Sequence, residues 1–392
     1  MASKPPPAFD EDLYGDELLL DPCGAYHAIR ELGSAVWLSQ HNMWAVGRFD
    51  DVRTALKADT ALISGRGVAA NEALNARQAP ITLTSDGDVH LRRRNVMIQP
   101  LLPASLKTLR TDIETEAGRL VEQLATGEKF EAVSRFASHL PISIVAELVG
   151  LDDGGRANML GWASATFNAL GVMNDRGMAS MPTLLDLRGY VQSLDRTGMK
   201  PGAWAARLFE AAERGEISPD EAKAMVIDYV VPALDTTILA TAHMLWLLAT
   251  APAAYDALRV EPGLVPSVVN EAVRLASPIR SFTRFAVDDI QVGDAIIPKG
   301  SRALVLFASA NRDERHYSDP DSFDIRRNPR DHVGWGHGAH VCAGMHLARL
   351  EMEALLTALV QHVGRITIGK PVCIKNNVLQ GFERLPAAFH PV

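Results

Sequence analysis

The feature that most constrains the fold is a long run of helix-forming, mainly apolar residues from Ser218 to Thr250. Ser218 suits the N-cap position, Pro219 the first helical position, and Glu221 the position that completes a capping box. Beyond Met225 the run is apolar nearly all round, so we expect this helix to be buried in the middle of the molecule.

Helix-breaking and polar residues interrupt the run at its centre. Pro232 cannot donate a hydrogen bond to the carbonyl of Asp228, and a proline in a helix interior costs about 3 kcal/mol. Asp235 and Thr236 follow, and a carboxylate among apolar residues is costly unless it is paired. We therefore expect the helix to bend or open within a turn of Thr236, and we interpret the interruption as a functional site.

The rest of the chain predicts further helices and a few short strands. Residues 35–56 have the pattern of two strands and a helix, residues 89–149 show mainly helical periodicity, and residues 288–310 have the pattern of strands and turns. No linker divides the chain. We expect a loose, proline-rich arm over residues 1–20 and a single, mainly α domain with a minor β part over residues 21–392.

Charge and cysteine content exclude several classes of protein. The net charge is −8 and the pI about 5.9, so a chain-wide basic footprint for nucleic acid is absent. No uninterrupted apolar run reaches the roughly 18 residues of a membrane span, and the first residues lack the apolar core of a signal peptide. The three cysteines make no disulfide framework. We expect a cytoplasmic protein.

One cysteine stands in a setting that predicts chemistry. The stretch "HVGWGHGAHVCAGMHLARLEMEALL" places Gly334, Gly336 and Gly338 before Cys342, and a clear helix follows. Glycines allow a tight loop, and a helix N-terminus stabilises a thiolate. The thiolate would be a nucleophile with His340 as its base, or a metal ligand. Zinc requires three or four protein ligands, whereas haem iron requires one.

The segment "WGHGAHVCAG" resembles the haem-binding signature of cytochromes P450. Trp335 stands where that signature usually has phenylalanine, and its indole is a candidate to tune the sulfur. The resemblance implies the cytochrome P450 fold, a triangular helical prism with a long central helix over the haem. It also implies haem b as the cofactor, with Cys342 as the metal ligand through its thiolate.

The resemblance covers nearly the whole chain and implies roles for further residues. "NEAVRLASP" resembles the Glu-x-x-Arg pair of the family, and "ALDTT" resembles its acid–alcohol pair on the oxygen-binding helix. The roles implied are proton relay for Asp235 and Thr236, binding of haem propionates for His90, Arg94, Arg284 and His340, and support of the haem loop for Glu271, Arg274 and Arg327.

Within the family, the chain most resembles bacterial enzymes that act on para-substituted benzoates, including 4-methoxybenzoate O-demethylases. The implied substrate-contacting residues are Phe167, Leu170, Arg77, Val231, Ile279 and Phe282. Asp228 stands where that group has a residue favourable to a carboxylate, and Arg280 is a possible replacement partner for an anion. A neutral methoxyphenol therefore competes with a benzoate as the expected substrate.

The resemblance implies a monooxygenase that hydroxylates or O-demethylates a small aromatic compound with O2. Its electrons would come from NAD(P)H through a reductase and an iron–sulfur ferredoxin, which Arg92 and Arg93 are candidates to dock. We expect neither a nucleic acid nor a membrane as a partner. The alternatives are a hydroxylase of a compact terpenoid or other apolar natural product, a peroxide-driven peroxygenase, and a haem binder or sensor without enzymatic activity.

Overall fold

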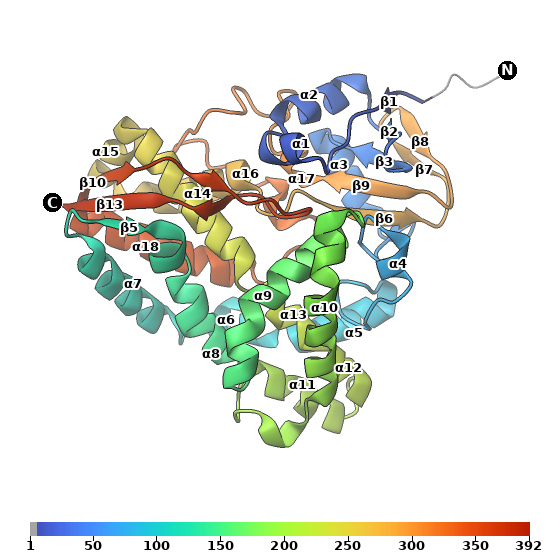
Figure 1. Cartoon of the computed structure of the whole chain (residues 1–392), viewed down its shortest axis with the longest axis horizontal. Helices are drawn as coiled ribbons and strands as arrows, with labels where there is room; N and C mark the ends of the chain where they lie inside the picture. Colours follow the sequence, from blue (N-terminus) through green and yellow to red (C-terminus); the bar gives the residue numbers. More distant parts are fainter. Residues whose placement is uncertain (1–5) are drawn as a thin grey trace.

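The computed structural model describes residues 6–392, which form a roughly triangular arrangement of helices with a sheet at one corner (Figure 1). The longer helices are α2 Cys23–Leu32, α3 Phe49–Lys57, α5 Gly87–Met97, α7 Arg110–Leu124, α9 Asp153–Leu170, α10 Asp175–Ser193, α11 Trp204–Glu213, α14 Asp235–Thr250, α15 Pro252–Val260, α16 Val265–Ala276 and α18 Met345–His362. Helices α9 to α12 form the apex opposite the sheet (Figure 1).

Shorter helical segments connect these elements. They are α1 Asp16–Leu20, α4 Glu72–Asn75, η1 Gln99–Leu101, α6 Pro103–Leu106, η2 Val133–Ala137, η3 Pro141–Val145, α8 Ala146–Val149, η4 Arg196–Gly198, α12 Pro219–Met225, α13 Ile227–Val230, η5 Pro262–Leu264, α17 Phe307–Ala310, η6 Val333–Trp335 and η7 Gly338–His340.

The strands form one larger sheet and several small ones. The six-stranded sheet has the order β1-β2-β3-β9-β6-β4, with β1 parallel to β2, β3 parallel to β9, and the other pairs antiparallel. The strands are β1 Ala8–Phe9, β2 Val36–Leu38, β3 Met43–Val46, β4 Leu62–Ile63, β5 Lys129–Glu131, β6 Ser281–Ala286, β7 Ile290–Val292, β8 Ala295–Ile297, β9 Arg302–Leu306, β10 Val363–Ile368, β11 Val372–Cys373, β12 Phe382–Arg384 and β13 Pro386–Pro391. These bounds confirm the two strands and the helix expected over residues 35–56.

The long central run begins as its sequence predicts. Ser218 Oγ accepts the backbone N–H of Glu221 at 3.1 Å, and Glu221 Oε2 accepts the backbone N–H of Ser218 at 2.7 Å, which completes the capping box. By length and composition Pro219–Thr250 could cross a membrane, but 72% of its most apolar window is buried inside the protein. This run is therefore packed inside the core of the protein.

The expectation of one continuous helix to Thr250 is wrong, whereas the expected opening at Pro232 is present. The run consists of α12, α13 and α14, and residues 231–234 between α13 and α14 are not helical. Pro232 lacks a backbone N–H, and Leu234 has φ −107° and ψ −68°, outside the usual helical values. The interruption leaves Asp235 and Thr236 in the first turn of α14.

The expected loose arm over residues 1–20 is not found at residues 8–20. Residues 1–5 lie outside the described part of the chain. Strand β1 pairs with β2, and Phe9, Leu13 and Tyr14 are buried in a cluster with strands of the larger sheet. Their apolar side chains outweigh the prolines before them, so the segment after residue 7 packs onto the fold.

Candidate active site

The loop before Cys342 is built on glycines whose backbone excludes other residues. Gly336 and Gly338 have φ of 71° and 73°, a region that strongly favours glycine. A Cβ on Gly338 would lie 2.4 Å from the backbone oxygen of Leu56 on α3. The backbone N–H of Cys342 donates to the carbonyl of Trp335 at 2.8 Å, which closes the loop immediately before α18.

The Cys342 side chain is exposed, although protein atoms crowd around its sulfur. It retains accessible surface, yet the protein surrounds it closely enough for desolvation to raise the pKa of its thiol. The backbone amides of Gly344 and Met345 act in the opposite direction and stabilise the thiolate, as expected at a helix N-terminus. Burial is the larger effect, so the pKa of the Cys342 thiol is raised overall.

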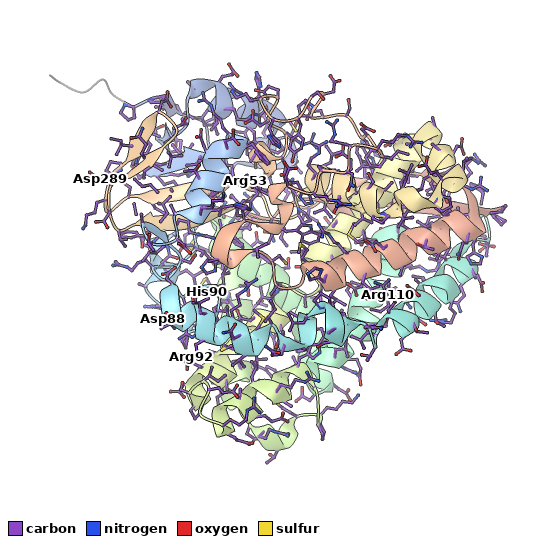
Figure 2. All side chains as sticks on the ribbon, turned by 180° about the vertical axis from the view of Figure 1, so that it is seen from behind. Arg53, Asp88, His90, Arg92, Arg110 and Asp289 are labelled. Atoms are coloured by element: carbon purple, nitrogen blue, oxygen red, sulfur yellow. The ribbon has the colours of Figure 1, made fainter. Side chains whose placement is uncertain are left out.

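Two histidines and an arginine from separate elements converge beside this loop. The ring centroids of His90 on α5 and His340 on η7 are 4.2 Å apart, and Arg94 Nη2 donates to the carbonyl of Val341 at 2.6 Å. Burial, together with Arg284, lowers the pKa of His340 to about 3, and His90 Nε2 is buried without a hydrogen-bond partner among the described residues. Figure 2 shows where His90 and Arg92 lie on α5.

Arg284 on β6 completes this basic group. It is 4% exposed, and within the described part of the chain its side chain donates one hydrogen bond, from Nη1 to the carbonyl of Thr283 at 2.9 Å. Desolvation lowers the pKa of Arg284 to about 10, and the carboxylate of Asp86 offsets it only in part. A buried guanidinium with this little compensation is costly unless an anion binds it.

Glu271, Arg274 and Arg327 meet in one network, as the resemblance implied. Arg274 Nε and Nη2 each donate to Glu271 at 2.7 Å, and Arg327 Nε donates to Glu271 Oε1 at 3.1 Å. The side chains of Glu271 and Arg274 are both 0% exposed. Arg274 Nη1 also donates to the carbonyls of Asn311 and Pro320, so the pair anchors the irregular segment that precedes the cysteine loop.

The acid and the hydroxyl at the helix opening differ in their hydrogen bonds. Thr236 Oγ1 donates to the carbonyl of Pro232 at 3.0 Å, the bond that a threonine in a helix commonly makes to its own backbone. Asp235 is 8% exposed, and its Oδ2 has no partner among the described residues. Burial raises the pKa of Asp235 to about 7.

The residues expected to contact substrate separate into two groups. The apolar ones lie in one core cluster, in which Phe167 and Val231 are buried and Leu170, Ile279 and Phe282 are partly buried. Arg77 instead lies exposed after α4, without a side-chain hydrogen bond or ion pair to any residue that the structure describes.

Two further charged residues have partners that the sequence did not reveal. Asp228 Oδ2 accepts the backbone N–H of Thr82 at 3.0 Å, and burial raises the pKa of Asp228 to about 6. Arg280 donates to the carbonyls of Leu19 and Leu379. Asp228 is thus engaged with the loop before α5, and Arg280 with the N-terminal and C-terminal segments.

Arg92 and Arg93, the residues expected to dock a partner protein, form ion pairs with Glu221 of the same chain, although Arg92 stays exposed. Arg92 donates from Nη2 and Nη1 to the two carboxylate oxygens of Glu221 at 2.7 and 2.9 Å, and Arg93 Nε donates to Glu221 Oε1 at 2.9 Å. Glu221 is the capping-box residue of α12, so both arginines tie α5 to the long central run.

The sequence analysis missed a basic hollow between α6, α7 and α18. Its cavity volume is about 520 Å³. Lys107, Arg110, His346 and Arg349 line it together with one acid, Glu353. The guanidinium of Arg349 lies 5.7 Å from the centre of the Trp335 ring, which links the hollow to the cysteine loop. The sequence signal that indicates this hollow is the spacing of Lys107 and Arg110, and of His346 and Arg349, because the members of each pair are one helical turn apart.

The donor set fits haem better than zinc or a nucleophilic cysteine. Cys342 is the one cysteine at this site, so tetrahedral zinc lacks protein ligands. As the base of a nucleophilic cysteine, His340 would have to be neutral, and burial keeps it so. However, its ring contacts the ring of His90, and it lies among Arg94 and Arg284. The buried Arg284, the half-buried Arg94 and the unpartnered nitrogen of His90 suit the two carboxylates of a haem.

Comparison with known proteins supports this interpretation. The family profile "Cytochrome P450" matches residues 192–364. The chain is 33% identical over 386 residues to cytochrome p450 CYP199A2 of Rhodopseudomonas palustris, covering 97% of this chain and 94% of that protein. It is 29% identical to linalool 8-monooxygenase of Pseudomonas putida, covering 97% and 98% of the two chains.

Solved structures have the same fold. Cytochrome P450 CYP109Q5 from Chondromyces apiculatus superposes with a TM-score of 0.82 at 25% identity, over 98% of this chain and 99% of that one. Myxobacterial cytochrome P450 CYP267B1, solved with myristic acid, gives a TM-score of 0.84 at 26% identity over 96% and 98%. Sequence and fold agree along nearly the whole chain, which therefore belongs to the cytochrome P450 family of monooxygenases, whose haem has a cysteine thiolate as its axial ligand.

Proposed function

We propose that this haem monooxygenase hydroxylates or oxidatively O-demethylates a small aromatic substrate of the methoxyphenol or para-substituted benzoate type. The observation that carries the proposal is the helix opening at residues 231–234. It leaves the Asp235–Thr236 pair next to an apolar cluster that contains Phe167 and Phe282. Similarity to cytochrome p450 CYP199A2 supports the proposal.

Cys342 would hold the haem iron through its thiolate, and the basic group beside it would hold the haem carboxylates. His90, Arg94, Arg284 and His340 come from three separate elements and meet beside the cysteine loop. When bound, haem supplies the activation of dioxygen and the insertion of one oxygen atom into the substrate. The Glu271–Arg274–Arg327 network fixes the chain segment that leads into the loop.

Asp235 and Thr236 are the proposed proton relay. A group with a pKa of about 7 exchanges protons readily near neutral pH, and Asp235 has that pKa because it is buried. The hydroxyl hydrogen of Thr236 is donated to Pro232, so its oxygen lone pairs are available to accept a hydrogen bond. Together they can position a water and pass a proton through the opening.

The Asp235–Thr236 pair also argues against two alternative functions, a peroxide-driven peroxygenase and a haem binder without activity, because neither of them needs a proton relay.

Charge near the apolar cluster favours a neutral ring over a benzoate. Asp228 has a pKa of about 6 and is therefore largely ionised at neutral pH, which disfavours a second carboxylate nearby. Arg77 is the candidate that would reverse this preference, because no ion pair holds it among the described residues. A compact terpenoid alcohol is the second candidate, since the chain resembles linalool 8-monooxygenase and its cluster is apolar.

The proposed electron donor is an acidic iron–sulfur ferredoxin reduced by NAD(P)H, which docks at the hollow lined by Lys107, Arg110, His346 and Arg349. We place the docking site there rather than at Arg92 and Arg93, which share a single ion-pair partner, Glu221. The setting we propose is the cytoplasm.

Lys107→Glu should slow electron transfer and weaken its salt dependence, whereas Arg92→Gln should leave the rate and its salt dependence unchanged. Stopped-flow reduction by a bacterial ferredoxin measures this.

The test of the substrate class is a titration of the haem spin state. 4-Methoxyphenol, 4-methoxybenzoate and linalool are added to the holoprotein, and the low-spin to high-spin change is followed by absorbance. We expect 4-methoxyphenol to bind most tightly, and Arg77→Ala to weaken only 4-methoxybenzoate. A response to linalool without any response to either aromatic compound would overturn the aromatic assignment.

A further inference from the structure

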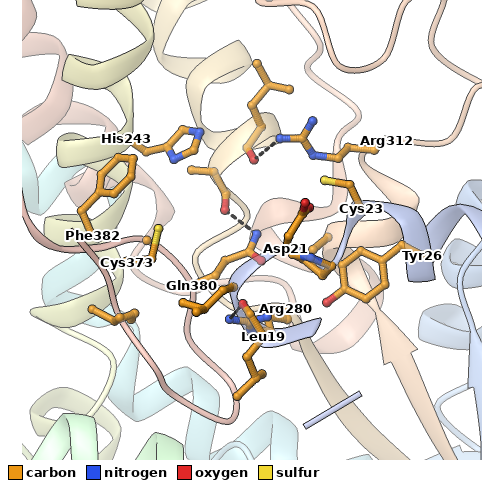
Figure 3. Close-up of a pocket in the computed structure, with 17 residues that line it drawn as sticks. Leu19, Asp21, Cys23, Tyr26, His243, Arg280, Arg312, Cys373, Gln380 and Phe382 are labelled. Carbon is orange, nitrogen blue, oxygen red and sulfur yellow. Dashed lines mark hydrogen bonds between the residues drawn. The ribbon is translucent and has the colours of Figure 1, made fainter. Parts of the chain in front are cut away.

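A second cavity, of about 170 Å³, lies between the N-terminal helices and the C-terminal hairpin (Figure 3). Its walls come from α1 and α2, from His243 on α14, from the end of α16, from α17, and from β11 and β12. Apart from Arg280, which the sequence offered as a possible partner for a substrate anion, none of the residues proposed above to contact haem or substrate lines it. The monooxygenase reaction therefore leaves this cavity without a role.

A buried arginine stands in the wall of this cavity without an acidic partner. Arg280 is 4% exposed, and its Nη2 donates to the carbonyl of Leu19 at 2.8 Å and to that of Leu379 at 3.2 Å. It also forms a hydrogen bond with the Tyr26 hydroxyl. Every one of these partners is neutral. A buried guanidinium without a counter-ion is costly, so its position favours an anion.

Among the described residues, no acidic side chain around the cavity pairs with Arg280. Arg312 lines the opposite wall and pairs with Asp321 at 2.5 Å, outside the cavity lining. Burial and Arg312 lower the pKa of His243 to about 3, so its ring is neutral, and its Nε2 has no partner among the described residues. Asp21, an exposed residue, is the one acid in the lining.

The remaining walls are apolar and suit a ring. His243 and Phe382 are stacked, with ring centroids 5.6 Å apart and planes 9° apart, and Leu275 and Ile374 lie in the same lining. An apolar cavity of about 150 Å³ accepts a molecule as large as benzene. We propose that this second cavity binds a small organic carboxylate, with its carboxylate on Arg280 and its apolar body against Phe382 and His243.

Ile279 and Arg280 are neighbours in the sequence, and the backbone explains how Ile279 belongs to the proposed substrate site and Arg280 to the second cavity. Ile279 forms a β-bridge with Leu379, and side chains of consecutive extended residues point to opposite sides. Ile279 packs against the large core cluster that contains Phe167, whereas Arg280 lines the second cavity. An anion at Arg280 is therefore behind the wall of the proposed substrate site and not in it.

Two accessible cysteines in the lining, Cys23 and Cys373, provide a direct readout. The holoprotein is treated with N-ethylmaleimide in the presence of benzoate, and mass spectrometry follows the labelling rate at each cysteine. Imidazole saturates the haem iron throughout, so that binding at the proposed substrate site does not contribute. Benzyl alcohol serves as the neutral probe of similar shape, and inorganic phosphate as the anion without an apolar body.

We expect benzoate to slow labelling of Cys373 saturably, and benzyl alcohol and phosphate to have little effect. Arg280→Gln should raise the half-protecting benzoate concentration about tenfold, because it removes a charge-assisted hydrogen bond. Arg312→Gln, at a partly exposed position, should raise it by a smaller factor and remains informative if Arg280→Gln fails to fold. Arg315→Gln, on the same segment but outside the lining, is the matched control.

Three results would overturn the proposal. Labelling of Cys373 that does not respond to benzoate would show that the cavity does not bind it. Equal protection by phosphate or benzyl alcohol would refute an organic carboxylate as the ligand. Unchanged protection in folded Arg280→Gln and Arg312→Gln would refute the assigned anchor.

Discussion

The segment that leads into the cysteine loop and the opening in the central helix are stabilised in opposite ways. Glu271 and Arg274 are completely buried, and each satisfies the charge of the other through paired hydrogen bonds. Asp235 is also buried, but one of its oxygens has no partner among the described residues, and Pro232 removes a helix hydrogen bond beside it. A satisfied network fixes one geometry, whereas an unsatisfied acid keeps a pKa suited to proton transfer. The molecule thus combines a rigid support for its cofactor with an interrupted, titratable helix segment for its chemistry.

The largest expected effect is the loss of the thiolate ligand. Cys342→Ser should abolish the ferrous–CO absorption band that is typical of a thiolate-ligated haem, because an alcohol does not replace a thiolate at iron. Cys373→Ser is the matched control and should retain that band. The band is measured after dithionite reduction under CO, and its survival in Cys342→Ser would contradict the ligand assignment.

Breaking the satisfied network should destabilise the whole protein. Glu271→Gln leaves Arg274 buried and unpaired, and the loss of one partner of a buried pair costs about 3–5 kcal/mol. Urea denaturation followed by circular dichroism measures the free energy of unfolding. Lys299→Gln, which breaks a pair between exposed side chains, should show no measurable loss. Equal effects of the two substitutions would remove the contrast between buried and exposed pairs.

Asp235→Asn should act on both chemistry and pH dependence. Burial raises the pKa of Asp235 to about 7, so the native state binds more protons than the unfolded state between about pH 4 and 7. Its contribution therefore lowers the stability of the protein as pH rises through that window. We expect Asp235→Asn to flatten this loss and to slow turnover several-fold. Urea midpoints at several pH values and NADH consumption provide the measurements, and an unchanged pH profile would show that Asp235 is not the group responsible.

The smallest expected effect concerns the proline. Pro232→Ala restores a backbone N–H that can donate to Asp228, so the opening should narrow. We expect a modest fall, about two- to fivefold, in substrate affinity and in product formed per NADH. Spin-state titration and product analysis measure the two quantities. Unchanged values would show that the proline is tolerated but not required.

Contiguous motifs made the cofactor side of the molecule predictable from sequence. Gly336, Gly338 and Cys342 lie within a few residues of one another, and the glycines are required by the local backbone. The opening at Pro232 could likewise be predicted because a missing N–H acts locally. His90 and His340 are far apart in sequence, and only the resemblance to a family brought them together before the structure did.

Contacts between distant segments could not be predicted. Glu221 lies 129 residues after Arg92, and no pattern in either stretch indicates their pairing. The same holds for Asp228, which binds the backbone of Thr82, and for Arg280, which binds the backbone of Leu19. Each of these bonds depends on tertiary packing that periodicity and local propensity do not encode.

The most direct test of the contrast between the two regions is the coupling of electron use to product in neighbouring threonine variants. Thr236→Ala removes the hydroxyl at the opening, whereas Thr237→Ala removes one from the next, buried position of α14. With a substrate that shifts the spin state, NADH consumed, product formed and hydrogen peroxide released are measured together. The proposed relay predicts that Thr236→Ala diverts most electrons to peroxide while Thr237→Ala stays close to wild type. Equal coupling in both variants would contradict it.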